Sequence, residues 1–325
     1  MVQTELSDVL FKKPGHLIRR LQTLATTLYL EAVGSVDATF DQFCVLSAVV
    51  VHPKTDQLRI ALATGLDRST VSGVIIRLEA KALISRQEDP ADRRAKLLTA
   101  TREGKKLFAT LSAAADNADA RLLEALPARQ RATFARMLAR VVDESDAASR
   151  VPVARSEDSK LLAPALYKRP IYQLRRLQQY AVTVFLEATS GYDITPVQFG
   201  ALVSVLARPG IDQIRLSQIV GFDRNTLSGV LERLEGKGLI TREASVADRR
   251  AKVLYLTQTG SDLYKTLFDA TEAANVRMLP GLSDVERATF LKLIERIVWA
   301  HNDLSRAPVD EVAARAIHKP QPASF

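Results

Sequence analysis

The sequence has very little cysteine: Cys44 is the only one among 325 residues. A single cysteine excludes an internal disulfide framework and is typical of a reducing compartment, so we expect a cytoplasmic protein. No apolar run approaches the length that crosses a membrane. The first residues, MVQTELSDVLFKK, also lack the pattern of a signal peptide. We therefore expect no membrane partner.

Residues that bind metals or perform catalysis are also scarce. The sequence shows no glycine-rich phosphate loop and no nucleophile motif. The histidines do not form a cluster with the spacing of a metal site; they are His16, His52, His301 and His318. We therefore expect no metal, no cofactor and no enzymatic activity.

The composition is that of a globular, basic protein. Hydrophobic residues make up 47% of the chain, enough to bury a core in each half, and the length suggests about two domains. Lysine and arginine outnumber aspartate and glutamate, which gives a formal net charge of +8. This charge favours an anionic partner such as nucleic acid, although many basic proteins bind none.

The chain is an internal repeat. The string ADRRAK occurs at residues 91–96 and again at 247–252, an offset of 156 residues. The same offset, without a gap, aligns PGHLIRRLQ with PIYQLRRLQ and continues to about Val142. We predict a first copy at residues 1–150, a connection at 151–166 and a second copy at 167–325.

The order of elements in each copy is predicted from apolar spacing, caps and breakers. In the first copy we expect helices over 14–33, 40–51 and 57–64, a turn at Gly65, and a fourth helix from the N-cap Asp67 to about Ala82. Two short extended segments around the polar loop EDPADRR form a hairpin, and two helices follow, from Thr101 to about Leu123 and from Pro127 to near Val142. The predicted fold class is mainly α with small β-hairpin wings.

The fourth helix has one apolar face and one small, polar face. Its core face is predicted to hold Val71, Val74, Ile75 and Leu78. The opposite face holds Ser69, Gly73, Ile76 and Ala80, and the aligned face of the second copy holds Asn225, Gly229, Glu232 and Gly236. Small residues allow close approach to another surface, and polar groups at the N-terminal end suit bases and phosphates. A solvated amphipathic helix is the alternative interpretation.

A helix, a glycine turn, an N-capped helix and a hairpin together make a winged helix-turn-helix. The stretches LDRSTVSGVIIRLEAKALISRQEDPADRRAKLLTATREGKKL and FDRNTLSGVLERLEGKGLITREASVADRRAKVLYLTQTGSDL both resemble the MarR family of bacterial transcriptional regulators. The resemblance covers nearly all of both halves. Members of that family are ordinarily homodimers of a chain about half this length, so the resemblance implies tandem domains that form an internal pseudo-twofold dimer.

The resemblance implies that the protein binds double-stranded DNA. In the family the hairpin wing lies along the DNA, so the resemblance implies that the arginines of ADRRAK contact the minor groove or its phosphates. The alternative is that they form a self-contained salt bridge in a surface hairpin. The expected DNA-binding residues are Arg68, Ser69, Thr70, Ser72, Arg77, Arg93 and Arg94 in the first copy, and Arg224, Asn225, Thr226, Ser228, Arg233, Arg249 and Arg250 in the second. Because these faces have diverged, we expect the DNA site to be an imperfect palindrome. A single chain should suffice for binding, and further self-association stays possible.

The first helix of each copy resembles the Leu-Ile-Arg-Arg segments of MarR members that sense aromatic carboxylic acids. That resemblance implies a repressor released by a small aromatic effector, since an arginine can grip a carboxylate through two hydrogen bonds. The expected ligand-binding residues are His16, Arg19, Arg20, Tyr29, Phe43, Tyr172, Arg175, Arg176, Phe185 and Phe199. The alternative is that these arginines make ion pairs between the two halves. His16 aligns with Tyr172 and Tyr29 with Phe185, so the two clefts need not bind equally.

Two other functions remain open. Cys44 would make a redox-responsive regulator, but it lies beside Phe43 on an apolar helix and has no second cysteine to resolve it, so structural burial is the preferred interpretation. A protein-interaction scaffold without DNA binding is the other alternative. The retention of ADRRAK in both copies argues against it.

Overall fold

The structure is a computed structural model that describes residues 12–88, 96–146, 164–244, 252–304 and 308. Its described part is mostly helical and divides into two compact units. The copy-1 unit comprises described residues of 22–180 and 280–286, and the copy-2 unit comprises those of 12–21, 181–279 and 287–308. Among these residues no helix is long and apolar enough to cross a membrane.

The boundaries of the units differ from those of the sequence copies. Helix α2 (Pro14–Val33) is divided at Leu21, so that its first turns belong to the copy-2 unit and the rest to the copy-1 unit. Helix α9 (Pro170–Ala188) is divided at Tyr180 in the reciprocal way. Each unit therefore combines the winged helix of one sequence copy with the start of the first helix of the other copy.

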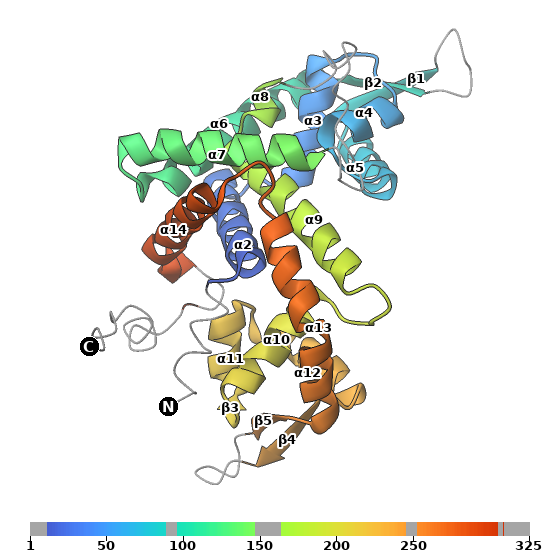
Figure 1. Cartoon of the computed structure of the whole chain (residues 1–325). Coiled ribbons are helices and arrows are strands. Elements are labelled where there is room, and N and C mark those ends of the chain that lie inside the picture. Colours follow the sequence, from blue (N-terminus) through green and yellow to red (C-terminus); the bar gives the residue numbers. More distant parts are fainter. Residues whose placement is uncertain (1–11, 89–95, 147–163, 245–251, 305–307, 309–325) are drawn as a thin grey trace. The chain divides into compact units, whose positions relative to one another are not determined.

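The copy-1 unit contains the elements expected for the first copy (Figure 1). They are α3 (Phe40–Val51), α4 (Gln57–Thr64), α5 (Arg68–Ala80), β1 (Ile84–Glu88), β2 (Lys96–Ala100), α6 (Arg102–Glu124) and α7 (Ala128–Asp146). The unit also contains the short helix α8 (Pro164–Tyr167), which was not predicted and begins in the expected connection. Strands β1 and β2 pair antiparallel in the register Ile84–Ala100 to Glu88–Lys96. The fold class of a helical protein with small β-hairpins is confirmed.

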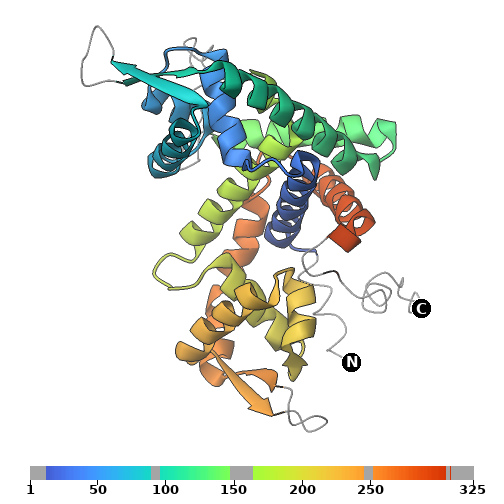
Figure 2. The same ribbon diagram turned by 180° about the vertical axis from the view of Figure 1, so that it is seen from behind.

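The copy-2 unit repeats this order (Figure 2). Its elements are α10 (Pro196–Ala207), β3 (Ile211–Asp212), α11 (Gln213–Val220), α12 (Arg224–Gly236), β4 (Ile240–Ala244), β5 (Lys252–Leu256), α13 (Gln258–Arg277), most of α14 (Asp284–Ala300) and the short η2 (Asn302–Leu304). Strand β3 adds to β5, giving the order β3-β5-β4. In the copy-1 unit the same place holds a single bridge between Thr55 and Leu98.

The turn between the two helices of each helix-turn-helix is built as the sequence predicts. Gly65 and Gly221 adopt left-handed conformations, with φ of 61° and 71°, which glycine adopts without steric cost. Asp67 and Asp223 then cap α5 and α12 by accepting the backbone N–H of Thr70 and Thr226. Helix α5 ends at Ala80 rather than at Ala82, because Ala82 has a φ of 54° that a helix cannot continue.

The predicted core face of α5 is confirmed. Its four apolar residues are each at most 1% exposed, while Ile76 on the opposite face is 59% exposed. Helix α6 is attached to the hairpin by Thr101, whose hydroxyl accepts the N–H of Gly104 at 3.0 Å. A Cβ at position 104 would overlap the carbonyl oxygen of Leu83, so glycine is required there. The spacing Thr-x-x-Gly thus fixes the approach of the long helix to the wing.

Candidate functional site

The N-terminal turn of α5 presents polar groups that are already held in place. Asp67 accepts hydrogen bonds from the hydroxyls of Ser69 at 2.5 Å and Thr70 at 2.7 Å, as well as from the Thr70 N–H at 2.8 Å. These hydrogen bonds lower the pKa of Asp67 to about 2, so it remains an anion. Arg68, Ser69 and Arg77 are exposed, and Thr70 and Ser72 are half-buried.

The corresponding turn of α12 is organised differently at one position. Asp223 again accepts from the hydroxyl of Thr226 at 2.7 Å. Asn225 stands where the first copy has Ser69, and its side chain is exposed. Ser228 donates to Glu232 at 3.1 Å, one turn further along the same helix. The two predicted recognition helices, α5 and α12, therefore differ on their exposed faces, which hold Ser69 and Ile76 in the first copy and Asn225 and Glu232 in the second.

Exposed cations surround both recognition helices. Arg224 and Arg233 are exposed, like Arg68 and Arg77 in the first copy. Arg215, which was not predicted to bind DNA, has a side chain that is 76% exposed near the start of α11. The wing arginines Arg93, Arg94, Arg249 and Arg250 lie outside the described residues. Their proposed role in binding DNA stays a prediction.

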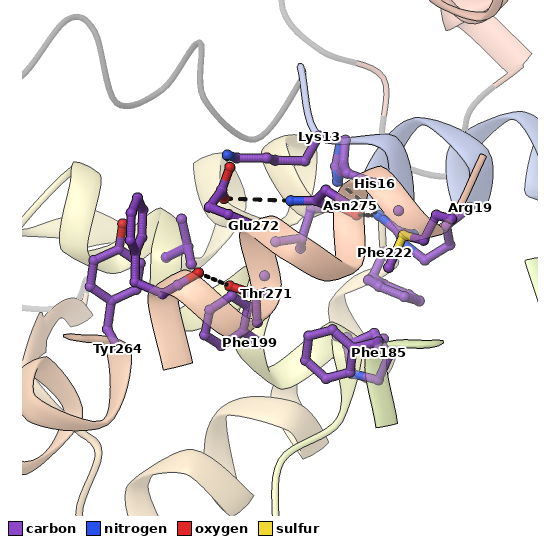
Figure 3. Close-up of a pocket in the computed structure, with 18 residues that line it drawn as sticks. Lys13, His16, Arg19, Phe185, Phe199, Phe222, Tyr264, Thr271, Glu272 and Asn275 are labelled. Atoms are coloured by element: carbon purple, nitrogen blue, oxygen red, sulfur yellow. Dashed lines mark hydrogen bonds and ion pairs between the residues drawn. The ribbon is translucent and has the colours of Figure 1, made fainter. Parts of the chain in front are cut away.

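A cavity lies in the copy-2 unit, between the start of α2 and helices α9, α10, α11 and α13 (Figure 3). Its empty volume, counted to the open solvent at its mouth, is about 810 Å³. Its lining is mainly aromatic and aliphatic, and its five aromatic rings are Phe185, Phe199, Phe222, Tyr264 and Phe268.

Arg19 is the cation in this cavity that lacks a carboxylate partner among the described residues. One Nη2 hydrogen bond goes to the carbonyl of Val220, at the end of α11, and Nη2 lies 3.4 Å from Nδ1 of His16. The Nη1 atom is buried and has no hydrogen-bond partner in the described structure. The guanidinium carbon lies 4.3 Å from the centre of the Phe222 ring. Burial, with a smaller contribution from the charge of Arg20, lowers the pKa of Arg19 to about 9.

The other charged groups of the cavity are already neutralised. Lys13 forms an ion pair of 2.5 Å with Glu272, and the amide of Asn275 donates to the same carboxylate at 3.4 Å (Figure 3). Burial, followed by the charges of Arg19 and Arg20, lowers the pKa of His16 well below its ordinary value. His16 is therefore neutral at pH 7. Arg19 remains as an uncompensated positive charge in an aromatic cavity.

Arg20 has another role than its neighbour. Its Nη1 donates to the carbonyl of Gln218 at 3.0 Å and to that of Ile219 at 3.4 Å, both in the last turn of α11. A cation at the C-terminus of a helix is favoured by the helix dipole and by unsatisfied carbonyls. Arg19 and Arg20 together thus hold the first helix of the helix-turn-helix. Of the two, Arg19 lines the cavity.

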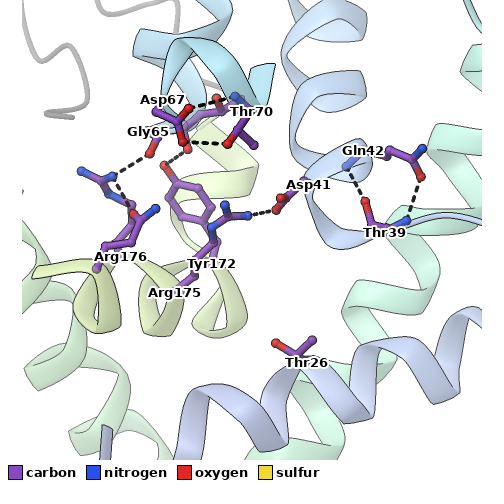
Figure 4. A network of polar contacts seen from close by, with 12 residues as sticks. Thr26, Thr39, Asp41, Gln42, Gly65, Asp67, Thr70, Tyr172, Arg175 and Arg176 are labelled. Carbon is purple, nitrogen blue, oxygen red and sulfur yellow. Dashed lines mark hydrogen bonds and ion pairs between the residues drawn. The ribbon is translucent and has the colours of Figure 1, made fainter. Parts of the chain in front are cut away.

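Five predicted ligand residues lie in the copy-1 unit: Tyr29, Phe43, Tyr172, Arg175 and Arg176. Figure 4 shows the last three. Arg175 forms an ion pair with Asp41, and the Tyr172 hydroxyl donates to the carbonyl of Thr64 at 3.1 Å. Arg176 donates to the carbonyl of Gly65 at 3.0 Å. Tyr29 and Phe43 are fully buried, with ring centres 6.1 Å apart.

Arg176 also forms a buried ion pair with Asp146, at 2.6 Å, in which both side chains are 2% exposed. The alternative that the first-helix arginines form ion pairs between the two sequence halves therefore describes Arg175 and Arg176. These pairs lie within the copy-1 unit, because α9 begins there. Arg19 and Arg20, at the aligned positions, donate to main-chain carbonyls of α11.

Sequence reasoning identified four of the residues that line the cavity and missed others. His16, Arg19, Phe185 and Phe199 were predicted and are brought together. Helix α13 and its C-cap residue contribute a stripe that was not predicted, at positions i, i+4, i+7, i+11 and i+14: Tyr264, Phe268, Thr271, Asn275 and Met278. This helical spacing was available in the sequence. Its mixture of polar and apolar residues obscured it.

The fold and the two exposed, arginine-flanked recognition helices define a winged helix DNA-binding protein. Profiles of the MarR family match residues 36–95 and 194–252. The chain belongs to the MarR family, with one match in each half. MarR proteins are transcriptional regulators, which confirms the class of function expected from the sequence.

The chain is similar to several regulators of transcription. The chain is similar to a putative transcriptional regulatory protein for the hcr operon of Thauera aromatica, with 31% identity over 38% of this chain and 73% of the relative. It is similar to the transcriptional repressor NicR of Pseudomonas putida, with 27% identity over 41% of this chain and 84% of the relative. A solved structure of the PcaV regulator of Streptomyces coelicolor with its natural ligand is 32% identical over 42% of this chain and 96% of PcaV, at a TM-score of 0.40.

Proposed function

We propose that the protein is a cytoplasmic transcriptional repressor that binds double-stranded DNA through α5 and α12 and is released by a small aromatic carboxylate. The DNA-binding part is supported by the family, by the polar N-terminal turns of both recognition helices and by their exposed arginines. Repression is the activity that the name of the similar NicR protein states. Regulation of this kind needs no catalysis, and we infer that the protein is not an enzyme.

The class of effector is inferred from Arg19. A buried guanidinium without a carboxylate partner costs free energy, which an anionic ligand would recover. The aromatic rings of the cavity favour a flat, apolar body attached to that anion. An aromatic carboxylate has both features. The buried guanidinium of Arg19, without a carboxylate partner among the described residues, is the single observation that carries the ligand proposal.

The effector would act through the hydrogen bond of Arg19 to α11. A carboxylate held by both Nη atoms competes with the Val220 carbonyl, which Arg19 now caps. Losing this cap would loosen the end of α11 and the turn at Gly221, and so change the position of α12. A ligand can shift such an equilibrium only by its difference in affinity for the two positions. One competing hydrogen bond at the hinge of the recognition helix provides that difference.

The ligand proposal is tested by calorimetry with benzoate and salicylate and by release of DNA from the protein. Arg19→Ala should weaken binding about ten- to a hundredfold, since a charge-assisted hydrogen bond contributes roughly 1.5–3 kcal/mol. Lys13→Ala is the matched control, because Glu272 already neutralises Lys13, and it should change affinity much less. If neither acid binds at millimolar concentration, the ligand class is wrong, while the DNA-binding proposal stands.

The DNA proposal is tested by binding to the promoter of the protein's own gene. Arg94→Ala and Arg250→Ala should each weaken binding with little change in sequence preference, because wing residues bind mainly to phosphate or groove shape. Each should also lower the slope of log affinity against log salt by roughly one unit for each phosphate that the arginine no longer neutralises. Unchanged affinity and slope in the double variant would refute the assignment of the wings.

We further propose that one chain is sufficient and that its operator is an imperfect palindrome. Both recognition helices are present in one polypeptide, so binding needs no association of two chains. Their different residues at positions 69 and 225 favour half-sites that differ, about one helical turn apart. Scattering should give a compact particle of one chain, and two artificial palindromes should bind less tightly than the natural site.

A redox-responsive function is less well supported. Cys44 is fully buried, and burial raises the pKa of its thiol to about 12, so it is a poor nucleophile at pH 7. A Cys44→Ser variant that still responds normally would remove this alternative.

A further inference from the structure

The offset of 156 residues makes the two units comparable position by position. The residues that line the cavity of the copy-2 unit have counterparts in the copy-1 unit, and several of the differences add bulk or charge in the copy-1 unit. Two glycines of the cavity, Gly15 and Gly200, correspond to Ile171 and Cys44. Ile171 is 3% exposed and Cys44 is fully buried, so both side chains fill space. At Gly200 an added Cβ would meet nothing within 4 Å.

The position of Lys13 is taken by Arg169, which reaches into the copy-1 counterpart. Its Nη1 bonds Asp116 at 2.7 Å and Asp119 at 3.3 Å, and its Nη2 donates to the Ser112 hydroxyl at 2.9 Å. Its guanidinium carbon lies 5.6 Å from the centre of the Phe43 ring. Ser112 replaces Phe268, one of the rings that line the cavity. Arg169 thus occupies the aromatic surface that a ligand would use.

The position of Arg19 is taken by Arg175, whose charge is already compensated. Asp41, which forms its ion pair, corresponds to Val197, an apolar residue of the cavity lining. The charges of Arg175, Asp41 and Arg169 all act on the Cys44 thiol, which places that thiol within the same cluster. The carboxylate of a ligand would have to displace that of Asp41 from Arg175, so the net free energy of binding would be small.

We propose that the chain binds one effector, in the cavity of the copy-2 unit, and that the counterpart in the copy-1 unit is closed by its own side chains. Arg169 and Cys44 occupy its space, and Asp41 serves as an internal carboxylate for Arg175. This rests on the proposed function for the chemistry of the effector. Whether the cavity of the copy-2 unit is open and its counterpart in the copy-1 unit is filled does not depend on the chemistry of the effector.

One site has a regulatory consequence. Effector binding would act on α11 and α12 directly, while α4 and α5 keep the arrangement fixed by Arg176 and Tyr172. Release would begin at the half-site read by α12. The response to effector should therefore have a Hill coefficient of one per chain, in contrast to a protein with two equal, coupled sites.

The aligned pair Cys44 and Gly200 gives a test that needs no ligand. In the wild-type chain the only thiol, Cys44, lies in the filled counterpart in the copy-1 unit. In the Cys44→Ala/Gly200→Cys variant the only thiol lies in the open cavity of the copy-2 unit. At pH 8 the introduced thiol should react with Ellman's reagent on the order of a thousandfold faster, because it is reachable and ionises more readily. Both proteins should react alike in guanidinium chloride. Equal rates in the folded proteins would overturn the proposal.

Benzoate provides the second measurement. Calorimetry should give one site per chain, Arg19→Ala should weaken its affinity about ten- to a hundredfold, and Arg175→Ala, the matched control, should leave it unchanged. Benzoate should also protect the introduced thiol but not change the rate of Cys44. Two sites per chain, or a loss of binding in Arg175→Ala, would refute the inference. If benzoate does not bind, the proposed effector class fails, and the labelling rates alone still decide whether one position is closed.

Discussion

Replacing Asp146 by asparagine should strongly destabilise the copy-1 unit. Asp146 and Arg176 lie 2.6 Å apart, and both side chains are 2% exposed. The variant would remove the negative charge of Asp146 from beside a buried guanidinium. Removing one partner of a buried pair typically costs about 3–5 kcal/mol, because the remaining ion has lost its compensation. We expect a loss of about 3 kcal/mol in the free energy of unfolding, at the lower end of that range, since the amide oxygen retains one acceptor.

Urea unfolding followed by circular dichroism measures this loss. The control is Asp116→Asn, which also removes an aspartate paired with an arginine, but Asp116 is 70% exposed. That substitution should cost less than about 1 kcal/mol. The double variant Arg176→Met/Asp146→Leu should recover much of the loss, because it removes both charges. A loss in Asp146→Asn no larger than that of Asp116→Asn would refute the reasoning.

Further perturbations test other parts of the structure. Gly104→Ala should cost about 2 kcal/mol or more in thermal unfolding, because its Cβ would overlap the Leu83 carbonyl, while Gly236→Ala, with nothing within 4 Å, should be neutral or stabilising. Burial raises the pKa of Asp119 to about 6, so its contribution to stability is present below about pH 4 and lost as the pH rises through 6. Asp119→Asn should remove that fall, and an unchanged pH profile would contradict it. Asn225→Ser should shrink the advantage of the natural operator over artificial palindromes in binding titrations; equal affinities would mean that the divergence is neutral.

The duplication, the elements and the helix-turn-helix could be predicted from sequence because they depend on local interactions. Asp67 and Thr101 cap helices through residues three positions away, and Gly65 needs only its own backbone conformation. The core face of α5 follows from helical spacing alone. The error at the end of α5 is also local, since Ala82 has a positive φ that its residue type does not announce.

The candidate site could be predicted only in part. Arg19 and Arg20 were both candidates, and their order in the chain does not say which one lines the cavity. Phe222 and Tyr264 were missed because they come from elements far from Arg19 in sequence. The helical spacing of the stripe on α13 could be read from the sequence, but only the folded chain shows that this stripe faces Arg19.

By itself, the sequence determined that this protein has two winged helix copies, where each recognition helix begins, and which of its faces is exposed. The tertiary structure decided that each lobe packs against the first helix of the other copy, and that Arg19 faces an open cavity while Arg175 is bound to Asp41. The physical reason is the range of the interactions. Caps, turns and amphipathic faces are set by neighbours within a few residues, whereas an open or filled cavity is set by side chains that lie far apart in the sequence.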